Sequence, residues 1–147
     1  MTRAFAAGQG ALLAGLVALL LGLPLPGRAP ARAEEPISPS AFGAYAEGYT
    51  LYFSEGGEYF GAETYAPGRV TLWQFRYGDC VRGTWRAHGG QICFRYEDGD
   101  GEEICWRMLR DAKGLFARLL GDGPDAGMEL RVIRRDREPL RCGGPSA

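Results

Sequence analysis

The sequence predicts an all-β fold, an antiparallel meander of six to eight strands that forms a small closed or half-open barrel after one short helix. Short segments in which apolar and polar residues alternate follow one another along most of the chain, and glycine-rich turns separate them about every 10 residues. Short turns make consecutive strands antiparallel, and closing such a sheet into a barrel removes its exposed edges.

Residues 1–33 are predicted to be an export signal. A basic start ending at Arg3 precedes an apolar run of 13 residues, 11–23. That run is too short for a membrane anchor, which needs about 20 residues. The small residues of Ala31-Arg32-Ala33 form a cleavage site, so the mature chain is expected to begin at Glu34 and to keep no transmembrane anchor. An uncleaved N-terminal anchor is the alternative.

The predicted mature chain, residues 34–147, is a single domain with a net negative charge. It contains 14 Lys and Arg residues against 18 Asp and Glu residues. Nucleic-acid-binding domains concentrate basic residues on one face, so this composition argues against nucleic acid as a partner.

One helix is predicted directly after the signal. Ser38 is a good N-cap and Pro39 suits the first turn. Residues 41–45 place Ala and aromatic side chains on one side, and Gly48 ends the helix.

Six strands are predicted from the alternation, over residues 49–54, 59–65, 71–77, 81–86, 91–96 and 103–108. Weaker patterns at 115–120 and 128–133 predict a seventh and an eighth strand. Aromatic residues share one face of several strands, and we expect that face to form the barrel core: Trp73, Phe75, Trp85, Phe94, Tyr96 and Trp106. The alternative is that some of them line a ligand cavity, since small barrels often hold one ligand.

Four cysteines, with no Cys-x-x-Cys motif, favour structural disulfides over redox or metal chemistry. Pairing of the strands at 91–96 and 103–108 places Cys93 opposite Cys105. Elimination then leaves Cys80 for Cys142. Four cysteines allow three pairings, and the sequence leaves the choice open.

The pattern Cys80-x-x-Gly83-x-Trp85, then Ile92-Cys93-Phe94-Arg95-Tyr96-Glu97, then Cys105-Trp106 resembles a group of small exported proteins of alphaproteobacteria. Residues 65–69 ahead of this pattern and 139–142 behind it are also similar to that group. The resemblance covers most of the mature chain, and its motifs are structural in kind. It implies a periplasmic or secreted protein of the Gram-negative cell envelope and carries no activity.

Candidates for catalysis and metal binding are few. His88 is the only histidine and lies in a predicted turn without a Gly-x-Ser-x-Gly motif. The acidic residues of 98–103 are too few and too closely spaced for an EF-hand loop, so we expect a solvated turn and no metal or other cofactor. Glu63 and Glu97 would make a catalytic carboxylate pair only if the fold brings them together.

The polar face of the fourth to sixth predicted strands carries four arginines that make up a candidate ligand-binding surface: Arg82, Arg86, Arg95 and Arg107. Arginine recognises carboxylate and phosphate groups, so an anionic envelope glycan or lipid is the expected partner of this face. The alternative is an ordinary solvated face.

Two functions are compatible with these residues. A non-catalytic envelope-binding module, using the barrel mouth or the arginine face, is favoured. A small hydrolase or lyase that acts on an envelope polymer through Glu63 and Glu97 is the alternative. The ligand and the oligomeric state do not follow from the sequence.

Overall fold

The computed structural model describes residues 33–142, so the predicted signal cleavage lies at the edge of the described chain and the export signal lies outside it. The elements are β1 (Glu35–Pro36), α1 (Pro39–Ala46), β2 (Thr50–Glu55), β3 (Glu58–Ala66), β4 (Val70–Phe75), β5 (Cys80–His88), β6 (Gln91–Tyr96), β7 (Ile104–Asp111), β8 (Gly114–Leu119) and β9 (Glu129–Asp136).

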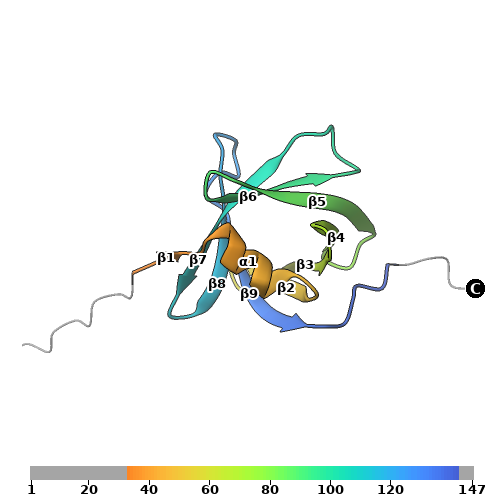
Figure 1. The fold of residues 1–147 in the computed structure, drawn as a ribbon, viewed down its shortest axis with the longest axis horizontal. Helices are drawn as coiled ribbons and strands as arrows, with labels where there is room; N and C mark the ends of the chain where they lie inside the picture. Colours follow the sequence, from red (N-terminus) through yellow and green to blue (C-terminus); the bar gives the residue numbers. More distant parts are fainter. Residues whose placement is uncertain (1–32, 143–147) are drawn as a thin grey trace, which may run out of the picture. The chain divides into compact units, whose positions relative to one another are not determined.

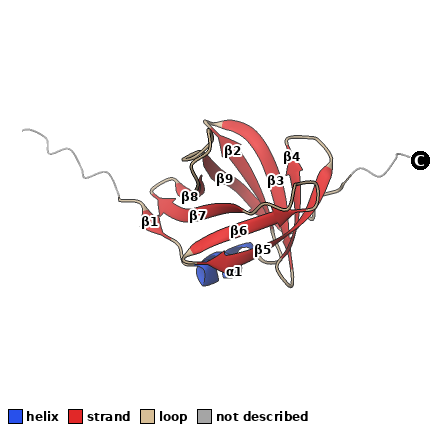
Figure 2. Ribbon diagram, turned by 90° about the horizontal axis from the view of Figure 1, so that it is seen from above, coloured by secondary structure: helices blue, strands red, loops and turns tan. Residues whose placement is uncertain are grey.

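Strands β2 to β9 form a closed, eight-stranded antiparallel barrel, which confirms the predicted fold class. Each strand pairs with the next along the chain, and β9 returns to pair with β2. In Figure 1 the strands follow one another around α1, and Figure 2 shows the same barrel turned by 90°. The two-residue strand β1, which the sequence analysis missed, pairs with the end of β7 through Glu35 and Arg110.

Helix α1 covers one end of the barrel. Ser38 caps the helix by accepting a hydrogen bond from the Ala41 amide, as predicted. Phe42 is buried and packs edge-on against Tyr65 and Trp85 inside the barrel. Within residues 33–142, no helix is both long enough and apolar enough to cross a membrane.

The helix-covered end and the opposite end of the barrel differ in their connections. The turns at 67–69, 89–90 and 112–113 lie at the end that carries α1. Residues 56–57, 76–79, 97–103 and 120–128 connect the strands at the other end, which we call the mouth.

Two strand details near the mouth differ from the prediction. Tyr77 was expected inside the third strand, but β4 ends at Phe75, and Tyr77 is 88% exposed. Arg76 has a φ of 51°, in the left-handed region, which turns the chain away from the sheet. In β3, the pairing of Phe53 with Gly61 and of Ser54 with Tyr59 leaves Phe60 as an extra residue in a β-bulge.

Both predicted disulfides are present. The sheet disulfide, Cys93–Cys105, joins directly paired residues of β6 and β7. The tail disulfide, Cys80–Cys142, ties the segment after β9 to the start of β5. These two bridges indicate an oxidising, extracytoplasmic environment.

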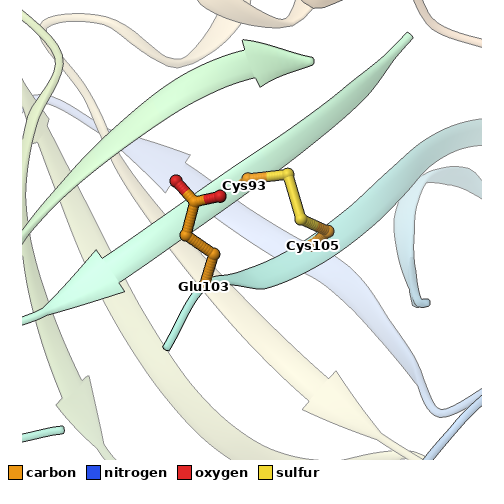
Figure 3. A group of neighbouring side chains, drawn as sticks. All are labelled: Cys93, Glu103 and Cys105. Carbon is orange, nitrogen blue, oxygen red and sulfur yellow. A yellow bond between two sulfur atoms is a disulfide. The ribbon is translucent and has the colours of Figure 1, made fainter. Parts of the chain in front are cut away.

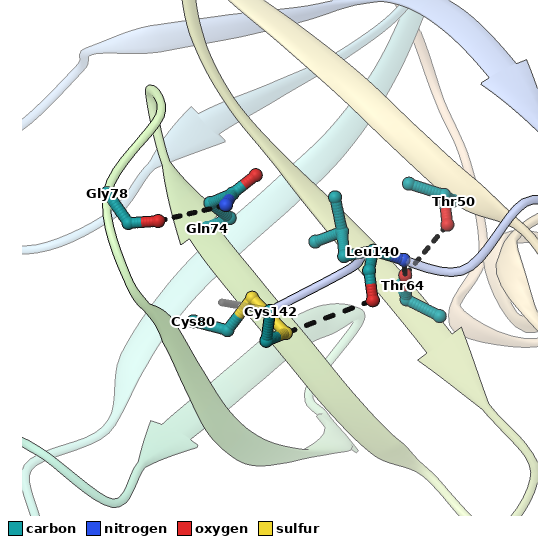
Figure 4. The surroundings of a disulfide bond; sticks show 7 residues. All are labelled: Thr50, Thr64, Gln74, Gly78, Cys80, Leu140 and Cys142. Atoms are coloured by element: carbon teal, nitrogen blue, oxygen red, sulfur yellow. Dashed lines mark hydrogen bonds between the residues drawn. A yellow bond between two sulfur atoms is a disulfide. The ribbon is translucent and has the colours of Figure 1, made fainter. Parts of the chain in front are cut away.

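The C-terminal segment is held along the outside of the barrel before it reaches the tail disulfide (Figure 4). The Thr50 hydroxyl donates to the Glu138 carbonyl at 2.7 Å, and the Leu140 amide donates to the Thr64 hydroxyl at 2.9 Å. The two threonines are neighbours on paired strands, so one polar pair on the outer surface positions the tail for the bridge.

Candidate functional site: an aromatic cavity with a buried carboxyl group

The barrel encloses a cavity of about 390 Å³ between its core and its mouth. Its walls are mostly aromatic and aliphatic, and Trp73, Phe94 and Trp106 contribute from three different strands. Phe75 and Ile104 also line it, although they are 48% and 42% exposed, so the cavity reaches the surface at the mouth. Most of the aromatic residues predicted for the core therefore line this space, whereas Trp85 packs under α1.

The bulge in β3 helps to shape the mouth. As the extra residue, Phe60 lies with its ring 5.1 Å from that of Phe75 and 6.0 Å from that of Trp73, and it lines the cavity. Strict alternation along β3 would place Phe60 on the outer face of the barrel. Because a bulge changes the direction of side chains along a strand, the Phe60 ring lies at the rim of the cavity instead.

Four paired residues form one row across the inner face of β3 to β6: Tyr65, Thr71, Gly83 and Tyr96. Gly83 leaves the space that Tyr96 occupies, because a Cβ atom at Gly83 would lie 2.7 Å from the Tyr96 ring. The missing side chain in β5 thus lets the Tyr96 ring approach the backbone and reach across the row.

Glu63 lies next to this row and is the buried carboxyl group of the cavity. It is only 3% exposed. The Tyr65 hydroxyl donates to its Oε2 at 2.7 Å, and the Tyr96 hydroxyl donates to its Oε1 at 2.9 Å. Each carboxyl oxygen therefore has one tyrosine donor.

Burial dominates the protonation of this group. Loss of hydration raises the pKa of Glu63 to about 7, although the hydrogen bonds from Tyr65 and Tyr96 and the nearby Thr71 hydroxyl oppose the shift. The Thr71 hydroxyl is buried beside the carboxyl group without meeting the geometry of a direct hydrogen bond. Burial, followed by the proximity of Glu63, raises the pKa of both tyrosine hydroxyls, so they remain donors.

The four arginines predicted as a binding surface lie exposed on the outside of β5, β6 and β7. Arg86 forms a two-pronged pair with Glu103, and Arg95 lies 3.7 Å from the same carboxylate. Arg82 pairs with Glu97 at 3.5 Å. Acids on the same surface thus compensate much of the charge, and the expected anionic ligand of this face stays a prediction.

The pair of carboxylates considered for catalysis is divided between the inside and the outside of the barrel. Glu63 is buried, whereas the side chain of Glu97 is 69% exposed and forms an ion pair with Arg82. His88 lies exposed at the end of β5, at the helix-covered end rather than at the mouth.

Among residues 33–142, one group of potential metal ligands lies on the outward-facing side of the sheet, where Glu103 approaches Cys93 and Cys105 (Figure 3). The two sulfur atoms are bonded to each other. Metal ligation by cysteine requires thiolates, so this group does not form a metal site while the disulfide is intact.

The sequence analysis considered Glu63 only as a partner of Glu97 and missed its place in the cavity. The signal was present in the alternation of β3, because Gly61, Glu63 and Tyr65 occupy one face. An acid on the face that also carries buried aromatic residues is a candidate for a functional group.

No protein-family model, curated protein or solved structure matches this chain. The geometry of the cavity is therefore the basis for the functional inference.

Proposed function

We propose that this protein is a non-catalytic binding module that holds one small, largely apolar molecule inside its barrel. The observation that carries the proposal is the cavity of about 390 Å³, which is lined by aromatic and aliphatic side chains and is reached from the mouth. Apolar clefts of this size with a few polar groups are typical of small-molecule sites.

The inventory of titratable groups supports binding over hydrolysis. Glu63 is the buried carboxyl group, whereas the two other acids along the cavity, Asp98 and Asp125, are exposed. Glycoside hydrolysis uses a pair of carboxyl groups that flank the scissile bond. A single buried carboxyl group held by two tyrosines instead suits the orientation of a bound polar group.

We also propose that the protein acts in the periplasm or outside a Gram-negative cell. The predicted export signal, the resemblance to exported proteins and the two disulfides support this location. Expression of the full chain should give a periplasmic protein whose intact mass corresponds to a start at Glu34. Recovery of membrane-bound protein with Met1 intact would contradict the proposal.

Three probes with one apolar body and different end groups test the binding function: 4-phenylbutanol, 4-phenylbutylamine and 4-phenylbutyrate. We expect at least one to bind with 1:1 stoichiometry in calorimetry and to change the tryptophan fluorescence, because Trp73 and Trp106 line the cavity. Binding should also raise the melting temperature.

A pair of alanine variants shows whether binding occurs inside the barrel. Ala117 lines the cavity, so Ala117→Phe should fill part of it and reduce binding. Ala44→Phe makes the same change on the exposed side of α1 and should leave binding unchanged. The proposed function is refuted if none of the three probes binds, or if Ala117→Phe folds and binds them as the parent does.

A further inference from the structure

The charged side chains that line the cavity are all acidic. Glu63 lies at its inner part, and Asp98 and Asp125 lie on the loops of the mouth. No lysine, arginine or histidine belongs to the lining formed by the described residues 33–142. A molecule that enters the cavity therefore meets carboxyl groups at the mouth and again inside.

The same bias extends over the mouth as a whole. Its connections at 56–57, 76–79, 97–103 and 120–128 contain eight acidic residues and one basic residue, Arg76. Two of the acids, Glu97 and Glu103, are paired with arginines of the outer surface. At the helix-covered end, residues 47–49, 67–69, 89–90 and 112–113 contain one acid and two basic residues.

This asymmetry produces a local negative potential at the mouth that the small net charge of the chain does not reveal. Charge of one sign around an apolar cleft attracts ligands of the opposite sign. The overall arginine content therefore does not set the preference of the cavity, because the arginines lie on the outer surface.

The walls behind the mouth suit the same kind of ligand. Trp73 lies beside Phe53 and Phe60, with ring centroids 6.0 Å apart in both pairs, and all three line the cavity. The faces of aromatic rings attract cations, and tryptophan does so most strongly. These walls accept both an apolar body and an ammonium group.

The inner polar cluster supplies an acceptor. Each Glu63 oxygen has one tyrosine donor, which leaves further lone pairs on the carboxylate. The Thr71 hydroxyl beside it is buried and has no hydrogen-bond partner among the described residues. The Glu63 carboxyl group can accept a hydrogen bond from a ligand N–H group, whereas a ligand carboxylate would meet a like charge whenever Glu63 is ionised.

We propose that the ligand is a small organic cation, an amine or quaternary ammonium compound with an apolar body. This inference rests on the proposed binding function and names the chemical class of the ligand. The expected charge of this ligand is opposite in sign to that of the anionic partner expected for the outer arginine face, which is a different surface of the barrel.

The three phenylbutyl probes make that comparison, because they differ only in the charge of the end group. At neutral pH and low salt, we expect the amine to bind about tenfold more tightly than the alcohol. The acid should bind most weakly. Raising the salt concentration should weaken binding of the amine and leave binding of the alcohol nearly unchanged, since exposed carboxylates are screened.

The mouth residues allow a test that does not disturb the core. A double variant, Asp98→Asn with Asp125→Asn, should lower the affinity for the amine about threefold and leave the alcohol unaffected, because both side chains are exposed. Glu47→Gln removes the same kind of charge at the helix-covered end and should change neither affinity.

The outcomes separate this inference from the proposed function. If the alcohol or the acid binds at least as tightly as the amine, and Ala117→Phe abolishes that binding, the cavity is a binding site but the cation preference is wrong. Equal loss of alcohol and amine affinity in the double variant would also overturn the preference. If no probe binds, the proposed function itself fails.

Discussion

Glu63 should make the stability of the protein depend on pH in the direction opposite to that of an ordinary surface carboxylate. Its pKa is raised from the usual 4.5 to about 7, mainly because burial disfavours the charged form. The unfolded chain therefore releases the Glu63 proton at a lower pH than the folded chain does. The stabilising contribution is fully present below about pH 4.5 and is lost as the pH rises through about 7.

The expected magnitude follows from the separation of the two pKa values. A separation of one pH unit corresponds to about 1.4 kcal/mol, so the contribution of Glu63 to the free energy of unfolding should decrease by about 3 kcal/mol between pH 4 and pH 8. Other groups act in the opposite direction, because their arginine partners lower the pKa values of Glu103 and Asp111. The total pH profile is therefore a poor measure of Glu63 alone.

A comparison with Glu63→Gln isolates the contribution, because the groups common to both proteins cancel. Urea unfolding of the oxidised proteins, measured from pH 4 to pH 8, should show the parent losing about 3 kcal/mol relative to the variant. A constant offset, caused by the change in hydrogen bonding to Tyr65 and Tyr96, does not affect this slope. Glu47→Gln, which replaces an exposed acid, should follow the parent at every pH.

The reasoning would be refuted by a difference between parent and Glu63→Gln that stays constant from pH 4 to pH 8. A parent that gains stability relative to the variant as the pH rises would also refute it, because that sign requires a lowered Glu63 pKa.

Three further predictions concern the barrel framework. Replacing the two cysteines of the tail disulfide by serine should lower the free energy of unfolding by about 4 kcal/mol, and the same change in the sheet disulfide should lower it by about 3 kcal/mol. The difference is expected because the bridges join residues 62 and 12 positions apart. A larger loss for the sheet disulfide in urea unfolding would contradict the loop-entropy argument. Gly83→Ala should destabilise the protein by about 1–3 kcal/mol by displacing the Tyr96 ring, whereas Gly99→Ala, with no contact closer than 3.6 Å, should change thermal stability little. Phe42→Ala should cost about 3–5 kcal/mol because the ring packs inside the covered end of the barrel, and a loss below 1 kcal/mol would show that α1 is not part of the folded core.

The regular parts of the fold were predictable because local chemistry determines them. Alternating residues and glycine turns located all eight barrel strands, and opposite positions on neighbouring strands identified the Cys93–Cys105 bridge. The Ser38 cap and the end of α1 before Gly48 also followed from local preferences. These features depend on contacts between residues that are close in sequence or joined by short turns.

The features that escaped prediction depend on breaks in regularity or on contacts across the barrel. The two-residue strand β1 is too short to show alternation, and it forms only because the edge at the end of β7 is free to pair with it. Phe60 lines the cavity through a bulge that shifts the alternation of β3. Tyr77 alternates correctly with Phe75, but the left-handed Arg76 ends the strand between them.

The arrangement around Glu63 shows why the number of polar residues on a strand indicates a functional site less well than the face of the strand on which they lie. On β3, Glu63 and Thr64 are adjacent in sequence, yet Thr64 faces outward and positions the C-terminal tail, whereas Glu63 faces the cavity. The cost of burying a carboxyl group is partly offset by two tyrosine donors from β3 and β6. A residue chosen only for stability at this position would be apolar, as are most side chains of the cavity wall. A costly buried acid, with donors placed to orient it, is the arrangement that the proposed recognition of a ligand requires.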